Sequence, residues 1–180
     1  MSRLDTLATA LAQVMSMAVN RILRLMTPAL SDLPSQLTPD PALTCGLGAL
    51  QKSVTALNAE ARFLASPASL DFVPVANSIE DHATMATLSV RKADQLLDCL
   101  RHALAVELLC SAQAIDLRPS PRLGQGTGTA YDAVRTLVPF LPEDEVLAPF
   151  VASIAEAVAT GGVLDAVNAA TSRRFGLDLA

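Results

Sequence analysis

The sequence predicts an all-α protein built around one unusually long helix. Hydrophobic residues make up 51% of the 180-residue chain, yet it contains no Trp, one Tyr and five Phe. A core of Ala, Leu and Val with so few aromatic side chains favours close-packed helices over a β-sandwich. The apolar residues recur at intervals of three and four, which is the helical period. The length suits one ordinary domain with a sizeable core.

Two amphipathic helices are expected in the first 65 residues. Over residues 4–26 the apolar side chains form one seam, made of Leu4, Leu7, Leu11, Val14, Ala18, Ile22 and Leu25. Four prolines between positions 28 and 41 then interrupt the helical pattern. A second helix is expected over residues 44–65, because its apolar positions follow a heptad-like spacing.

The third expected helix is too long for the domain that contains it. Residues 78–116 include neither Gly nor Pro, and at ~1.5 Å per residue a helix of that length extends roughly 57 Å. A compact chain of this size has a diameter of roughly 40 Å. The helix is also apolar on several faces, so it needs neighbours all around it. We therefore expect an obligate oligomer.

The chain is expected to divide into a core and a smaller C-terminal helical segment. Residues 1–117 form the predicted core bundle, and residues 118–128 are rich in Gly and Pro, as is typical of a linker. No predicted strand precedes these glycines, so they do not form a phosphate loop. Residues 129–180 are expected to form two or three shorter helices, over 129–139, 143–159 and 163–174.

Charge and cysteine content exclude several classes of function. A net charge of −5 argues against a nucleic-acid partner, which would need a basic face. Charges interrupt every apolar run before it reaches the ~18 residues of a membrane span, and the first residues do not form a signal peptide. Cys45, Cys99 and Cys110 fit neither a zinc site nor an even disulfide framework. We expect a cytoplasmic protein with reduced, buried thiols, no metal and no membrane partner.

Residues 77–87, NSIEDHATMAT, place Glu80, Asp81 and His82 together at the predicted start of the long helix. Ser78 can cap the first turn, with Asp81 as the reciprocal acceptor, and the helix dipole stabilises carboxylates there. A neutral imidazole beside a carboxylate could transfer a proton, although a hydrogen-bonded polar side chain is the simpler interpretation of His82. From the residues alone, capping and catalysis both stay open for this cluster.

Three stretches of the chain resemble the C-terminal half of the histidine and aromatic amino acid ammonia-lyases. They are FLASPASLD, NSIEDHATMAT and RKADQLLDCLRHALAVELLCSAQAIDLR. The resemblance continues upstream through LATALAQVMSMAVNRILRLMTPALSDLP and downstream through VPFLPEDEVLAPFVASIAEAV, so that it covers about residues 4–167. It implies a long-helix bundle that forms part of the oligomeric helical core of these lyases, and an L-amino acid as substrate.

The resemblance also implies a cofactor that this chain does not form. The family makes an electrophile, methylidene-imidazolone (MIO), from its own Ala-Ser-Gly tripeptide. This sequence contains no Ser-Gly dipeptide, and its only tyrosine, Tyr131, matches no catalytic motif of the family. The implied arrangement is a split enzyme, in which a larger lyase subunit carries the MIO, the catalytic tyrosine and the carboxylate-binding arginine. This chain would be the small subunit of a hetero-oligomer, such as a heterotetramer of pairs, and inactive alone.

By position, the resemblance gives Glu80 the catalytic role. The family's acid at this place faces the electrophile and the substrate's amino group, where a carboxylate holds the ammonium and can accept a proton. Ile79 stands where the family usually has an amide, and we expect it to line the substrate site and to make it drier. Asp81 is expected to cap the helix and orient Glu80, and His82 is expected to be structural.

Gly48 and Lys52 align with the family's side-chain pocket, so we expect both to bind the substrate. A lysine there favours a polar or anionic substrate side chain, and a solvated lysine on an exposed helix face is the competing interpretation. Glu107 has no base at the four-residue spacing and is expected to pair across helices.

Three functions remain open on the sequence. A subunit of an amino acid ammonia-lyase is the leading hypothesis. An aminomutase of the same family, which returns the ammonia to the neighbouring carbon, and a non-catalytic structural subunit that stabilises a larger lyase chain are the alternatives.

Overall fold

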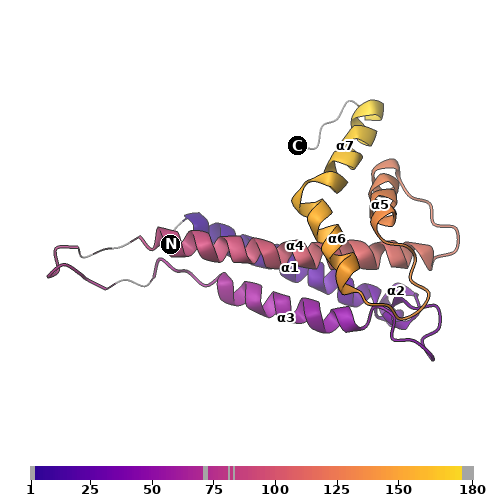
Figure 1. Ribbon diagram of the computed structural model, residues 1–180, viewed down its shortest axis with the longest axis horizontal. Helices are drawn as coiled ribbons and strands as arrows, with labels where there is room; N and C mark the ends of the chain where they lie inside the picture. Colours follow the sequence, from indigo (N-terminus) through magenta and orange to yellow (C-terminus); the bar gives the residue numbers. More distant parts are fainter. Residues whose placement is uncertain (1–2, 71–72, 81, 83, 176–180) are drawn as a thin grey trace.

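The computed structural model describes residues 3–70, 73–80, 82 and 84–175, with side chains described up to residue 172. Three long helices lie side by side in it (Figure 1): α1 (Arg3–Leu25), α3 (Ala49–Leu64) and α4 (Ala86–Asp116). Two short elements, α2 (Pro28–Ser31) and the 3-10 helix η1 (Ser35–Leu37), connect α1 to α3. The described residues contain seven α-helices and no β-strand, which confirms the predicted all-α class.

Helices α1 and α4 are parallel to each other, and α3 is antiparallel to both. Asp5 near the start of α1 hydrogen-bonds Ser89 near the start of α4, and Arg21 forms an ion pair with Glu107 toward their other ends. The expectation that Glu107 pairs across helices is therefore confirmed. The pair joins two helices that contact each other along most of their length.

Aliphatic side chains fill the bundle, as the composition predicts. The largest that are shielded from solvent include Met15, Ile22, Val54, Leu96 and Leu109. Alanines such as Ala18, Ala61, Ala103 and Ala105 are equally buried and allow the helix axes to approach closely. Helix α1 also has the length and apolarity of a membrane span, with a mean hydropathy of 1.2 over 18 residues. This corrects the prediction that charges interrupt every such run, although Met15, Val19 and Ile22 of α1 lie in the core, where an apolar helix is ordinary.

The central helix is shorter than predicted, because it begins at Ala86 and not near residue 78. Residues Ala76, Asn77 and Ser78 all have positive φ, between 52° and 66°, which a right-handed helix does not allow. Ser78 is therefore not the cap of α4. Asp81, the other half of the predicted capping pair, lies outside the described residues. At about 1.5 Å per residue the 31-residue helix still extends roughly 46 Å.

The C-terminal segment consists of α5 (Gln125–Leu137), α6 (Ala148–Ala159) and α7 (Gly162–Phe175), which stand against one side of α4 (Figure 1). Helix α5 starts four residues earlier than expected, within the stretch predicted to be a linker. Its Gly126 lies close to α7, since a Cβ added there would be 3.7 Å from Thr171 and from Val167. The glycine-rich start of α5 therefore packs against α7, a contact that the local sequence does not reveal.

A buried polar network joins the C-terminal segment to the bundle. The Gln113 side chain is inaccessible to solvent, and its Nε2 donates to the carbonyls of Leu37 (3.3 Å) and Leu141 (2.7 Å). Its Oε1 accepts the Leu141 N–H at 3.2 Å. Arg135 of α5 forms an ion pair with Asp116, and the Tyr131 hydroxyl also donates to Asp116. This hydrogen bond to a carboxylate raises the pKa of Tyr131.

Candidate functional site

Glu80 lies on the connector between α3 and α4, which we define as residues 66–85 and which is described at 66–70, 73–80, 82, 84 and 85. The connector extends beyond the ends of the three long helices (Figure 1). Within it, Val75 and Glu80 form an antiparallel bridge, with N–H···O distances of 3.0 and 3.3 Å. The bridge closes a tight hairpin over residues 75–80. Glu80 is thus positioned by a hairpin and not, as predicted, by the first turn of a helix.

The connector that carries Glu80 exposes several large apolar side chains to solvent. Ile79 exposes 83% of its surface, and other exposed apolar residues of the connector are Leu70, Val73 and Val75. Exposed apolar side chains that gather on one segment are typical of a surface that contacts another protein. His82 is also exposed. The described part of the chain therefore buries little of the connector, which carries the predicted catalytic residue.

Gly48 and Lys52 lie at the opposite end of α3 from the connector. Gly48 directly precedes the first residue of α3, and the connector begins after its last residue. The 16-residue helix separates these ends by about 24 Å at ~1.5 Å per residue. Glu80 and Ile79 therefore do not share one site with Gly48 and Lys52 inside this chain. The split enzyme that the resemblance implies would combine parts of different subunits in one site, so the roles of these residues stay predictions.

The surroundings of Gly48 give a packing reason for a glycine at this position. A Cβ added there would lie 3.0 Å from the Cys45 carbonyl oxygen and 3.0 Å from Oε1 of Gln36. That same Oε1 accepts a hydrogen bond of 2.8 Å from Gln51. Lys52 is exposed on the surface of α3, in agreement with the competing interpretation of a solvated lysine.

Asp144 fixes the turn before α3, a contact that the sequence did not predict. Its two carboxylate oxygens accept the backbone N–H groups of Cys45 (3.1 Å) and Gly46 (2.7 Å). Gly46 has a φ of +51°, which only glycine adopts readily. A carboxylate on two successive N–H groups is a strong anchor. The loop between α5 and α6 thereby positions the start of α3.

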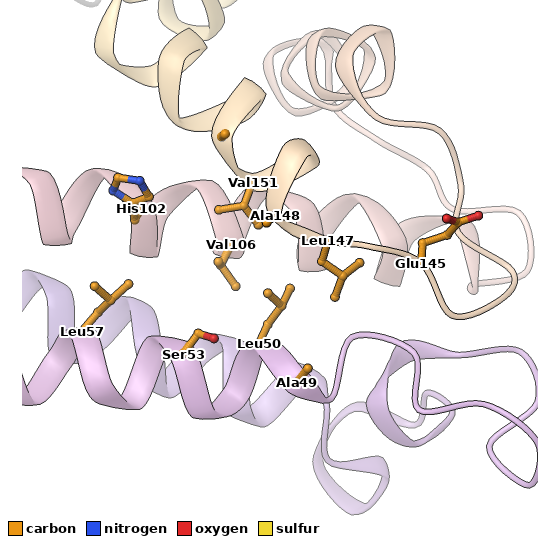
Figure 2. Close-up of a pocket in the computed structure, with 11 residues that line it drawn as sticks. Ala49, Leu50, Ser53, Leu57, His102, Val106, Glu145, Leu147, Ala148 and Val151 are labelled. Carbon is orange, nitrogen blue, oxygen red and sulfur yellow. The ribbon is translucent and has the colours of Figure 1, made fainter.

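An apolar cavity of about 480 Å³ lies between α3, α4 and α6 (Figure 2). Leu50, Leu57, Val106, Leu147 and Val151 are among the residues that line it, with Ser53, His102 and Glu145 as polar members. Figure 2 shows His102 and Glu145 far apart along the cavity. Nδ1 of His102 lies 2.9 Å from the Asp98 carbonyl oxygen, to which only a protonated Nδ1 can donate. The cavity includes none of the predicted site residues.

The described residues do not by themselves fit an MIO group. A cavity of about 430 Å³ near the connector is lined by residues 84–88 and Arg91, without Glu80 or Ile79. Ile79 has no polar side-chain atom that could hold the ring. The buried, unpaired polar atoms of the described residues are Nε of Arg135 and Oδ1 of Asn168, both in the C-terminal segment. No reaction step through the ring is therefore derived from this chain.

The three cysteines differ in environment. Cys99 and Cys110 are buried, and burial raises the pKa of both thiols. Cys45 is exposed, so the prediction that all three thiols are buried is wrong for this residue, which lies in the turn before α3. Among the described residues, no three His, Cys, Asp or Glu side chains gather as metal ligands would.

Comparison with known proteins gives one consistent result. The family model described as aromatic amino acid lyase matches residues 1–136. Histidine ammonia-lyase from Symbiobacterium thermophilum is 42% identical over 166 residues, which are 92% of this chain and 33% of that protein. Histidine ammonia-lyase from Deinococcus radiodurans is 35% identical over 170 residues, which are 94% of this chain and 32% of that protein.

Solved structures agree in fold. Tyrosine aminomutase from Streptomyces globisporus superimposes with a TM-score of 0.89 at 35% identity, over 98% of this chain and 33% of that one. The ergothionase of Treponema denticola, an ergothioneine-degrading enzyme, gives a TM-score of 0.86 at 36% identity, over 90% of this chain and 33% of that one. The chain thus spans about a third of the length of the relatives it matches.

Proposed function

Because the chain belongs to the aromatic amino acid lyase family, we propose that it supplies one wall of an amino acid ammonia-lyase active site, with Glu80 as the acid–base group. The observation that carries this proposal is the connector. It presents a carboxylate among exposed apolar side chains, beyond the ends of the bundle, where another protein surface can enclose it. Relatives about three times longer than this chain are named histidine ammonia-lyases, and a region equivalent to their remaining two thirds would supply the other parts of such a site.

The other walls come from a lyase region that carries Ala-Ser-Gly, from which the MIO would form. We propose that this region belongs to a larger separate subunit, and that the two chains form a hetero-oligomer such as a heterotetramer of pairs. Helix α4 supports an oligomer, because at roughly 46 Å it is longer than the ~40 Å diameter of a compact domain of this size. The exposed apolar side chains of the connector would be covered in that assembly.

Glu80 has two tasks in the proposed site. As a carboxylate it holds the substrate's ammonium group by a charge-assisted hydrogen bond. It then accepts a proton from that group, and can return it to the departing ammonia. Ile79 beside it excludes water, which strengthens the electrostatic interaction between carboxylate and ammonium.

The proposed substrate is an L-amino acid with a polar or anionic side chain. Lys52 carries the charge for this preference and is exposed, so a neighbouring subunit could bring a substrate to it. Relatives named histidine ammonia-lyase make L-histidine the first substrate to test. Replacing Lys52 with Met is expected to raise KM for the favoured substrate up to about fivefold, since an exposed charge pair contributes about 0.2–1 kcal/mol, with little change in kcat.

The test is a co-expression experiment. The protein is purified with an Ala-Ser-Gly-bearing lyase subunit, and the complex is assayed with each common L-amino acid for ammonia release and for the absorbance of an α,β-unsaturated acid. We expect a stable complex that releases ammonia, with neither chain active alone. If no complex forms, or if it releases ammonia from no amino acid, the proposal is wrong.

An aminomutase is the second candidate, and one observation favours it. The tyrosine aminomutase of Streptomyces globisporus matches 98% of this chain at a TM-score of 0.89. An aminomutase would give a β-amino acid as the main product, which chromatography of the same reaction distinguishes from the unsaturated acid. The third candidate is a structural subunit, and it would stabilise the larger chain without any loss of activity when Glu80 is replaced.

A further inference from the structure

One buried carboxylate, that of Asp5, contacts the start of the connector and the first turn of α4, which follows the connector. Asp5 lies in the first turn of α1 and exposes only 4% of its surface. Its Oδ1 accepts the backbone N–H of Ala68 at 3.2 Å and the hydroxyl of Ser89 at 3.2 Å. Its Oδ2 accepts the backbone N–H of Ser69 at 3.4 Å and the Ser69 hydroxyl. Four donors from two segments therefore converge on one side chain.

These segments flank Glu80 in the sequence. Ser69 lies 11 residues before Glu80, and Ser89 lies nine residues after it. Ser89 is itself buried in the first turn of α4, and Ala68 is buried where the connector leaves α3. The chain between them leaves the bundle and returns to it beside the same carboxylate. Asp5 thus joins the exit and the return of the segment that carries the proposed acid–base group.

An ordinary role for Asp5 as an acid at a helix start does not account for this geometry. A carboxylate in the first turn is stabilised by the dipole of its own helix. The Asp5 side chain instead reaches across to α4 and to the connector, where it accepts the backbone N–H groups of buried Ala68 and of partly buried Ser69. Burying a carboxylate costs free energy unless its oxygens accept hydrogen bonds. The four donors around Asp5 compensate for that cost.

We propose that Asp5 is the positioning residue for Glu80. By holding the start of the connector and the first turn of α4 together at the start of α1, it fixes the place and direction in which the Val75–Glu80 hairpin leaves the bundle. This inference rests on the proposed function, because Glu80 needs a fixed place only if it meets a substrate there. A small displacement of a reacting group lowers the rate of the chemical step by a large factor. We therefore expect loss of Asp5 to lower kcat.

The first experiment measures the anchor in the protein alone. In Asp5→Asn an amide N–H₂ replaces one acceptor and faces N–H and O–H donors. We expect backbone amide hydrogen exchange at Ala68 and Ser69 to become about tenfold faster or more, with exchange in the middle of α4 unchanged. Asp98→Asn is the matched control, since Asp98 is exposed on α4 and its carboxylate forms an ion pair with Arg101, far from the connector's anchor. Ser69→Ala, which removes one hydroxyl donor, should give a smaller change at the same amides.

The second experiment measures the consequence in the complex with the Ala-Ser-Gly subunit. Asp5→Asn should lower kcat about tenfold or more, while KM changes less than about threefold, because positioning acts on the chemical step. In a Glu80→Gln background the same substitution should have no further effect on kcat. A merely structural role would lower activity equally in both backgrounds, whereas residues that act through one group are not additive. Asp98→Asn should leave kcat unchanged.

The outcomes separate the two claims. Unchanged exchange at Ala68 and Ser69 in Asp5→Asn overturns the anchor, whatever the activity. Faster exchange with an additive loss of kcat in the Glu80→Gln background overturns the positioning role. A wild-type complex that releases no ammonia overturns the proposed function, and the positioning role with it, while the exchange result stands alone as a statement about the fold. Faster exchange together with a kcat loss that disappears in Glu80→Gln supports the proposal.

Discussion

The two ends of α4 differ in how completely this chain covers them. At the C-terminal end, Gln113 and Asp116 are satisfied by side chains and backbone groups of the same chain. At the N-terminal end, the connector presents Ile79 and the other exposed apolar residues to solvent. The difference indicates a division of roles. One end holds the bundle together, and the other end bears the proposed chemistry and would be covered by a neighbour in the proposed assembly.

The largest expected effect compares a core leucine with a connector isoleucine. Leu96 is inaccessible to solvent and Ile79 is 83% exposed. Leu96→Ala should lower the free energy of unfolding by about 3–5 kcal/mol, because it leaves a cavity. Ile79→Ala should change it by less than about 0.5 kcal/mol, as for other exposed positions. Urea denaturation of the purified protein measures both. An equal loss in the two variants would mean that the connector packs against its own bundle after all.

The next effect tests the buried network at the C-terminal end. Gln113→Ala leaves the Leu37 and Leu141 carbonyls and the Leu141 N–H without their partner, and should cost about 2–4 kcal/mol. Gln51→Ala is the matched control, since the Gln51 side chain donates one hydrogen bond, to the Gln36 side chain, and about 0.5–1 kcal/mol is expected. Thermal unfolding followed by circular dichroism distinguishes them. Similar melting temperatures for the two variants would contradict the assigned importance of the network.

Two glycines, one crowded and one with open space around it, test the packing of the turn before α3. A Cβ on Gly46 would lie 2.7 Å from Thr38 Cβ and 2.8 Å from the Gln36 carbonyl, at a φ of +51°. Gly46→Ala should therefore destabilise the protein by about 2 kcal/mol. Gly124 has no neighbour within 4 Å of such a Cβ, so Gly124→Ala should lie within about 0.5 kcal/mol of the wild type. If Gly124→Ala is the more harmful change in a denaturant titration, the turn has been misread.

The smallest effect is a fall in stability at alkaline pH. Burial raises the pKa of the Cys110 thiol in the folded protein, so the unfolded chain loses its thiol proton first as pH rises. Stability is therefore complete below the ordinary thiol pKa near 8.5 and declines above it, by about 1.4 kcal/mol at pH 9.5. Cys110→Ala should flatten this decline in denaturant titrations from pH 7.5 to 9.5. A wild-type stability that rises over the same range would have the wrong sign.

Repeating apolar positions made the bundle predictable. The seam from Leu4 to Leu25 gave the extent of α1 almost to the residue, but its buried face was wrong, because Leu7 and Val14 are exposed whereas Met15 and Val19 lie in the core. The lack of a local base partner indicated that Glu107 pairs across helices. The start of α4 was not predictable in this way. A stretch without Gly or Pro permits a helix but does not require one, and Ala76, Asn77 and Ser78 instead adopt positive φ values in a hairpin.

The anchors of the site could not be found from the sequence, because their partners are distant in it. Asp5 binds residues more than 60 positions away, and Asp144 binds backbone groups almost 100 positions away. In the sequence each is one of 18 acidic residues. None of these partners lies three or four residues away, where a helical pattern would reveal it. Glu80 was singled out only through the motif that resembles the ammonia-lyases. The folded chain adds the information that its carboxylate stands on an exposed hairpin.

The central claim is that Glu80 takes part in the reaction of an assembled lyase site, and one substitution tests it most directly. The rate of ammonia release by the complex with the Ala-Ser-Gly subunit is measured for the wild type, Glu80→Gln and Glu156→Gln, the last an exposed glutamate on α6. Glu80→Gln should lower kcat about 100-fold or more, the usual worth of an acid–base group, while Glu156→Gln leaves it unchanged. Full activity in a stable Glu80→Gln complex would contradict the account.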